Sequence, residues 1–159
     1  MRYRVGVGLV LAATTAAILA PTAQSSRIHA FTATYSGHAA GQVSGTNASG
    51  SGTATGRGSP IGRSTLSGTG AGVATSATCV AFNGKVVLRG RSGSIKLSVR
   101  GAHACASAAN ASSVAFRGSA SVTGGTSSFA GARGTLSFKG TFDKTSGAIT
   151  ISFKGRIRY

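Results

Sequence analysis

The sequence predicts an all-β protein, and the fold expected is a closed antiparallel barrel of about eight strands. Apolar and polar residues alternate strictly along the second half of the chain, and short glycine-containing turns separate the alternating runs. No stretch after the N-terminal segment has the apolar period of a helix. Alternation of period two is typical of antiparallel strands with one buried face. A β-sandwich of two packed sheets produces the same alternation and stays the alternative fold.

Residues 1–25 have the pattern of a secretory signal peptide. Arg2 and Arg4 precede an uncharged, mostly apolar run, Val5 to Ala20, and small residues follow, with cleavage expected after Ala23 or Ser25. The apolar run is short for a membrane span, so an uncleaved anchor is the weaker alternative. We therefore expect a secreted protein whose folded part, residues 26–159, is a single domain.

Residues 37–72 contain few large apolar side chains, and Gly recurs throughout them. Two interpretations fit this composition. The segment forms strands at the curved parts of a barrel, where Gly lets the backbone bend, or it is a mobile loop. A break is expected at Ser59-Pro60.

Alternation is clearest in four later runs, at residues 85–91, 94–100, 135–142 and 148–158. Asn83-Gly84 predicts a hairpin turn before the first run, because both residues tolerate positive φ. Ser92-Gly93 predicts a tight turn, and residues 143–147 predict a longer hairpin loop. The side chains expected to point inward are Val86, Leu88, Ile95, Leu97, Val99, Val114, Phe116, Leu136, Phe138, Phe142, Ile149, Ile151, Phe153 and Ile157.

An eight-stranded barrel is just wide enough for such side chains to fill it. We therefore expect an interior without a roomy cavity. The glycine-rich first half is the one region that could leave space for a small apolar ligand.

Cys79 and Cys105 are the only two cysteines. An exported chain folds in an oxidising environment, so a disulfide between them is expected. No Cys-x-x-Cys motif indicates a redox-active or zinc site.

The charge balance excludes most acid–base chemistry. Lys and Arg total 17 against one acid, Asp143, so a pair of catalytic carboxylates is impossible. No Gly-x-Ser-x-Gly elbow lies on a strand-to-helix turn, so a Ser-His-Asp triad is not expected. His29 and His38 are isolated, and His103 is interpreted as a loop residue. We predict no catalytic residue, no metal site and no cofactor.

Cations on alternating strands are predicted to point outward and to form two ridges. Neighbouring strands bring such side chains close together, and no acid lies nearby to neutralise them. The residues expected to bind anions are Lys85, Arg89, Arg91, Lys96, Arg100, Lys154, Arg156 and Arg158.

The partner expected for these ridges is an anionic cell-envelope or extracellular polymer, or an anionic lipid surface. Nucleic acid is not the expected partner, because few exposed aromatic side chains are available for base stacking and the chain is exported. Two other functions stay open. One is a small-molecule carrier or cyclase-like barrel, which requires a cavity, and the other is a structural surface protein.

The run Gly124-Gly125-Thr126-Ser127-Ser128-Phe129-Ala130-Gly131-Ala132-Arg133-Gly134 resembles a turn of allene-oxide-cyclase-like and dirigent-like β-barrels. The resemblance covers residues 113–159 and implies a barrel fold. Ser127 replaces the third Gly of the motif, and the polar pocket residues of the plant enzymes have no counterpart, so no catalytic residue is carried over. Phe129 is expected to pack over one barrel end.

Overall fold

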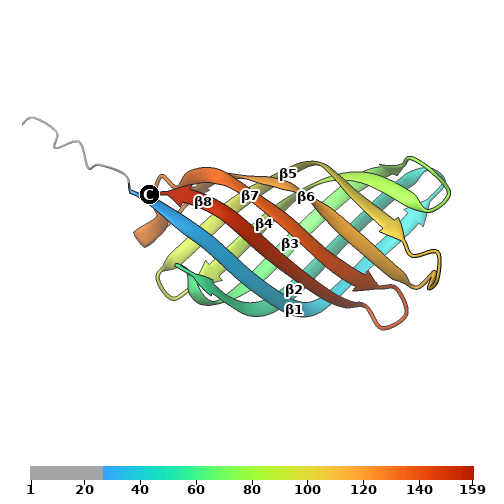
Figure 1. Ribbon diagram of the computed structural model, residues 1–159, viewed down its shortest axis with the longest axis horizontal. Helices are drawn as coiled ribbons and strands as arrows, with labels where there is room; N and C mark the ends of the chain where they lie inside the picture. The colour runs from blue at the N-terminus through green and yellow to red at the C-terminus, as the bar shows by residue number, and fades with distance from the viewer. Residues whose placement is uncertain (1–26) are drawn as a thin grey trace, which may run out of the picture.

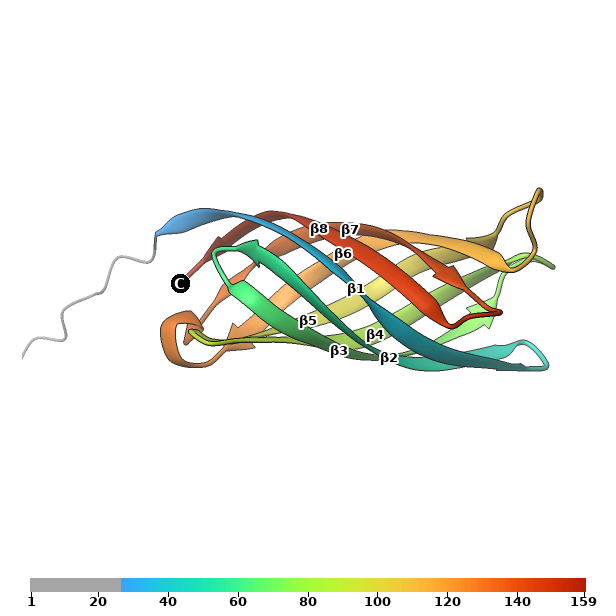
Figure 2. The ribbon, with the colours of Figure 1, turned by 90° about the horizontal axis from the view of Figure 1, so that it is seen from below.

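Eight antiparallel strands follow one another around a closed barrel (Figures 1 and 2). The computed structural model describes residues 27–159. The strands are β1 (Ile28–Ser44), β2 (Asn47–Ser59), β3 (Gly62–Ala74), β4 (Cys79–Gly90), β5 (Gly93–Ala106), β6 (Ser113–Gly125), β7 (Arg133–Asp143) and β8 (Ala148–Arg158). Each strand pairs with its neighbours in the chain, and β1 pairs with β8. The sheet therefore has no free edge, and the predicted barrel is confirmed over the sandwich.

The predicted signal peptide, residues 1–25, lies outside the described residues. Across residues 27–159, no helix is long and apolar enough to cross a membrane.

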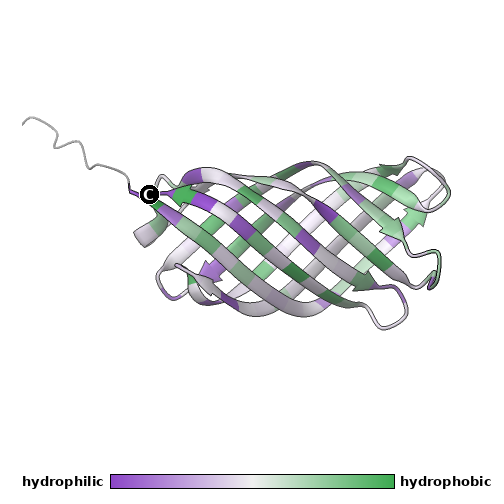
Figure 3. Cartoon of the chain, in the orientation of Figure 1, coloured by the Kyte–Doolittle hydropathy of each residue, from purple (hydrophilic) through white to green (hydrophobic). Residues whose placement is uncertain are grey.

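Alternate residues of each strand point into the barrel, as the sequence pattern predicts, and Figure 3 shows the resulting alternation of hydrophobic and hydrophilic positions. The fourteen predicted inward residues all lie on the inner face, and most of them belong to the buried core. The tight turn predicted at Ser92-Gly93 lies between β4 and β5, where Arg91 and Ser92 form the turn and Gly93 begins β5. Residues 143–147 form the predicted turn between β7 and β8.

The predicted hairpin turn at Asn83-Gly84 is wrong, because both residues lie within β4. The pairing of β4 with β5 shifts there, so that Asn83 alone faces Arg100 and Gly101. Gly101 has a φ of 60°, and its N–H donates to Asn83 Oδ1 at 2.9 Å. A β-bulge therefore uses the residue types of a turn without reversing the chain.

The glycine-rich segment, residues 37–72, forms strands and not a mobile loop. It provides the second half of β1, all of β2 and most of β3. Ser59-Pro60 lies at the turn between β2 and β3, where the break was predicted.

One end of the barrel is closed by side chains, and we call it the closed end. It carries both chain termini, the β2–β3 and β4–β5 turns and the β6–β7 connection with the short helix η1 (Ser127–Phe129). Phe129 is 2% exposed and packs edge-on against Tyr159, with 5.0 Å between ring centroids. Gly125 permits this packing, because a Cβ at its position would clash with the Ser94 carbonyl and the Phe129 backbone. The prediction that Phe129 packs over a barrel end is confirmed.

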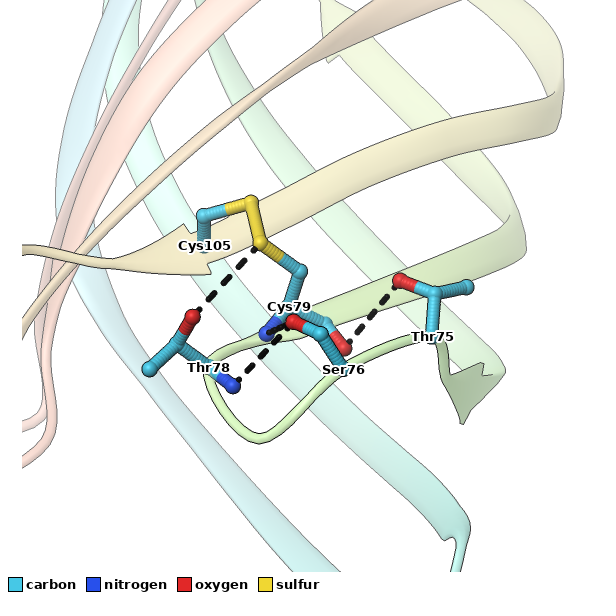
Figure 4. Close-up of a disulfide and its surroundings, with 5 residues drawn as sticks. All are labelled: Thr75, Ser76, Thr78, Cys79 and Cys105. Atoms are coloured by element: carbon cyan, nitrogen blue, oxygen red, sulfur yellow. Dashed lines mark hydrogen bonds between the residues drawn. A yellow bond between two sulfur atoms is a disulfide. The ribbon is translucent and has the colours of Figure 1, made fainter.

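The other end, which we call the open end, carries the β1–β2, β3–β4, β5–β6 and β7–β8 connections. Cys79 and Cys105 are direct cross-strand partners there and form the predicted disulfide on the outer face (Figure 4). Ser76 Oγ accepts from the Cys79 N–H at 3.1 Å, and Thr75 Oγ1 donates to the Cys79 carbonyl at 3.3 Å. The disulfide and these bonds fix the β3–β4 connection to the rim.

Replacing both cysteines by serine (Cys79→Ser with Cys105→Ser) should lower the free energy of unfolding by about 3 kcal/mol, because the cross-link restricts the unfolded chain. The barrel should still form, since β4 and β5 pair along their whole length. Urea unfolding followed by circular dichroism measures this change, and the reduced wild-type protein is the matched control. Equal stability of all three forms would contradict it.

Candidate functional site

A cavity of about 370 Å³ occupies the open half of the barrel and opens at that end. All eight strands contribute to its lining. Small residues of β1, β2 and β3 form one wall, and larger apolar residues of β4 to β8 form the opposite wall. The large lining residues are Val43 on β1, Leu66 on β3 and, on β4 to β8, Val80, Phe82, Val86, Val99, Val114, Phe116, Phe138, Phe142, Ile149, Ile151 and Phe153.

The cavity exists because the inner face of β2 carries almost no side-chain volume. Every inward residue of β2 is Ala or Gly, namely Ala48, Gly50, Gly52, Ala54, Gly56 and Gly58. The adjacent face of β3 continues with Gly68, Gly70 and Gly72. The expectation of a filled interior holds in the closed half and is wrong in the open half, where the opposite side chains are too short to cross the barrel.

The glycines that point inward differ in their surroundings: some lie against neighbouring backbone and others border open space. A Cβ on Gly56 would clash with the Thr34 carbonyl and the Tyr35 ring, so this glycine permits close packing. A Cβ on Gly41 would meet only the Ser49 carbonyl, at the ordinary contact distance of 3.5 Å. Gly41 therefore borders open space, and a side chain there would extend into the cavity.

The cavity lining is apolar except near its opening. Lys144 is the one charged residue among those that line it, and Gln42 lies near the rim. Ser49, Ser51, Thr53 and Thr69 also border the cavity, but they occupy outward positions of β2 and β3. Asp143 faces away from this lining: its Oδ1 accepts from the N–H groups of Thr145 and Ser146, both at 2.8 Å. These hydrogen bonds hold the pKa of the Asp143 carboxyl below its usual range. The single acid therefore shapes the β7–β8 turn.

A buried hydroxyl pair lies in the closed half of the barrel. Tyr35 is fully buried, and its Oη lies 2.8 Å from Ser64 Oγ, which in turn donates to the Gly62 carbonyl. Burial raises the pKa of Tyr35, and the Ser64 hydrogen bond offsets part of that effect. The pair links β1 to β3 across the glycine face of β2 and leaves no free hydroxyl pointing into the cavity.

The predicted anion-binding residues are exposed and lie on the outer face, except Arg91, which lies in the β4–β5 turn. The cations of β4 and β5 are not direct cross-strand partners of one another. Lys85 and Arg89 on β4 face Ser98 and Ser94 on β5, while Lys96 faces Val87, so the cations are diagonal neighbours. Lys154, Arg156 and Arg158 form the second ridge on β8, and Arg100 lies at the β5 bulge.

The structure also brings cations together that the sequence did not indicate as a site. Arg57 on β2 is the direct cross-strand partner of Arg63 on β3, and Arg117 on β6 is the partner of Lys139 on β7. Arg57 and Arg63 lie in the glycine-rich segment, whose register could not be read from apolar alternation. A hairpin centred on Pro60 would have indicated the pair.

The three histidines lie apart. His29 stacks on Tyr159 at 4.6 Å, His38 points outward from β1, and His103 belongs to β5 and not to a loop. Within residues 27–159, no three His, Cys, Asp or Glu side chains gather in a group that could hold a metal ion.

Comparison of the chain with protein-family models, with curated proteins and with solved structures found no significant match.

The buried Tyr35 hydroxyl predicts a pH-dependent contribution to stability. Because the pKa of Tyr35 in the folded barrel lies above the unfolded value of 10.0, this contribution is complete below pH 10 and is lost as the pH rises through the folded pKa. Tyr35→Phe should cost about 1 kcal/mol at neutral pH, and the gap to the wild type should shrink above pH 10. Other titrating groups are common to both chains and cancel. Unfolding by urea across this pH range measures the gap, and a gap that stays constant would contradict the assignment.

Proposed function

We propose that the protein is a non-catalytic binder of small apolar molecules, which it holds in the cavity of the open half. The observation that carries this proposal is the cavity itself, with its glycine wall, its apolar opposite wall and its opening at one end. Its volume lies near the lower end of the range for small-molecule sites, about 300–1,000 Å³. Such a lining stays dry and favours apolar ligands.

The chemistry of the lining favours a carrier over a cyclase-like enzyme. Acid–base catalysis needs a titrating group within hydrogen-bond reach of the reacting atom. Lys144 lies at the rim, on the β7–β8 turn, and the residues that point inward deeper in the described lining are apolar or Gly. The cavity can desolvate and orient a ligand, and these are the properties of a carrier.

Export of the protein is part of the same proposal. The Cys79–Cys105 disulfide is compatible with an extracytoplasmic location, since such bonds persist in oxidising compartments. A relationship to allene-oxide-cyclase-like and dirigent-like barrels is also proposed. It is supported by the eight-stranded barrel and by the position of Phe129 in the loop that carries the resemblance.

A second candidate function is association with an anionic partner through the outer cations. It is favoured by like charges placed directly opposite each other, as at Arg57 and Arg63. Such pairs destabilise a sheet unless something neutralises them. This association uses the outer face and is compatible with ligand binding inside.

Substitution of Gly41 tests the cavity. Gly41→Leu should place its side chain in the open half and raise the dissociation constant of a neutral apolar dye, 1-aminoanthracene, about tenfold, since about two methylene contacts are lost at about 0.8 kcal/mol each. Ala40→Leu adds the same kind of side chain to the outer face of the adjacent position and is the matched control. Dye fluorescence titration measures both.

Saturable binding by the wild type and by Ala40→Leu, with weaker binding by Gly41→Leu, supports the proposal. Equal binding by all three chains would place the dye outside the cavity. The absence of saturable binding in the wild type would favour a structural surface protein.

A further inference from the structure

Exposed cations gather at the closed end of the barrel. They lie on β2, β3, β4, β5, β7 and β8 and surround most of that end. We call these residues, together with Arg91 of the β4–β5 turn, the closed-end cations: Arg57, Arg63, Arg89, Arg91, Lys96, Arg133, Arg156 and Arg158. The connections at the open end contain one basic residue, Lys144, and the preceding Asp143 offsets its charge. The barrel is therefore electrically asymmetric along its axis.

The closed-end cations have no acid near them, because the one acid of residues 27–159 lies at the opposite end. Arg57 and Arg63 are direct cross-strand partners, and Arg156 and Arg158 follow each other along the outer face of β8. Arg133 is partly occupied, since its Nη1 donates to the carbonyls of Thr123 and Ala132. Arg89 Nη1 likewise donates to Ser67 Oγ at 3.1 Å. An anionic surface would relieve the mutual repulsion of the closed-end cations.

One observation favours a lipid surface over a soluble polymer. Ile28 is 70% exposed and lies beside Arg158 in the pairing of β1 with β8, so an apolar side chain stands among the cations. Basic and apolar groups together suit the headgroup region of a bilayer.

We infer that the closed end docks on the surface of a bilayer that contains anionic lipid, with the cavity opening directed away from it. This inference rests on the proposed association with anions. It adds which end of the barrel binds, what the anionic partner is, and how the barrel is oriented on it. Cations near an anionic membrane attract it individually, and the attraction fades within a Debye length of about 10 Å. Cations toward the open end should therefore contribute little.

The chain offers a matched pair of variants. Arg57→Gln with Arg63→Gln removes an opposed pair of cations near the closed end, and Arg117→Gln with Lys139→Gln removes an opposed pair nearer the open end. Both lose the same charge and relieve the same kind of repulsion. The chain from Arg27 to Tyr159 contains every strand of the closed barrel and is the form to test. Co-sedimentation with phosphatidylglycerol-containing vesicles at about 0.1 M salt measures the partition coefficient.

The wild type should bind these vesicles and not pure phosphatidylcholine vesicles. The Arg57/Arg63 variant should bind roughly tenfold more weakly, and the Arg117/Lys139 variant should lose less than about threefold. Arg156→Gln with Arg158→Gln removes two closed-end cations from a different strand, β8, and should weaken vesicle binding to a similar extent. Circular dichroism confirms that each variant is folded.

Equal losses in the two matched variants would overturn the inference and leave attraction by net charge alone. Binding to soluble polyphosphate without binding to vesicles would also overturn it, while the broader association with anions would stand. Binding to neither would remove that association as well. Exposed Val43 and Val73 lie at the open end; if Val43→Ser with Val73→Ser abolished vesicle binding, the proposed orientation would be reversed.

Discussion

Closure of the sheet between β1 and β8 is the constraint on which the rest of the structure depends. A closed eight-stranded barrel has a nearly fixed interior, and each strand contributes alternate residues to it. Any volume that these side chains do not fill stays as a cavity, because the backbone hydrogen bonds around the ring resist collapse. The inner face of β2, made only of Ala and Gly, therefore determines where the barrel is hollow.

The two halves of the barrel consequently have different physical roles. In the closed half, Phe31, Tyr35 and Phe129 fill the interior, and aromatic contacts between Phe129 and Tyr159 cover the end. In the open half, the disulfide and the pairing of the strands maintain the rim around an apolar space. Side-chain packing is concentrated at the closed end, and space for a ligand lies at the open end. The outer cations follow the same division, so that a partner at the closed end would leave the cavity accessible.

Much of this fold follows from the sequence, because strict alternation assigns the inner face of β7, of β8 and of β5 up to its bulge. The disulfide follows from having two cysteines in a chain that the sequence predicts to be exported. Two features could not be predicted. Asn83-Gly84 has the local chemistry of a turn, and only the pairing of β4 with β5 shows that it belongs to a bulge. The cavity depends on which glycines face inward. In a segment without large apolar residues, the sequence does not show which alternate residues point into the barrel.

We expect the open half of the barrel to contain an apolar cavity beside the glycine wall. A crystal structure determined under xenon pressure tests this directly, since xenon occupies apolar cavities. Xenon density should lie between the inner faces of Gly52 and Gly70 and the Phe116 and Phe138 rings. A barrel flattened so that β2 and β3 pack directly against those rings, without xenon between them, would contradict it.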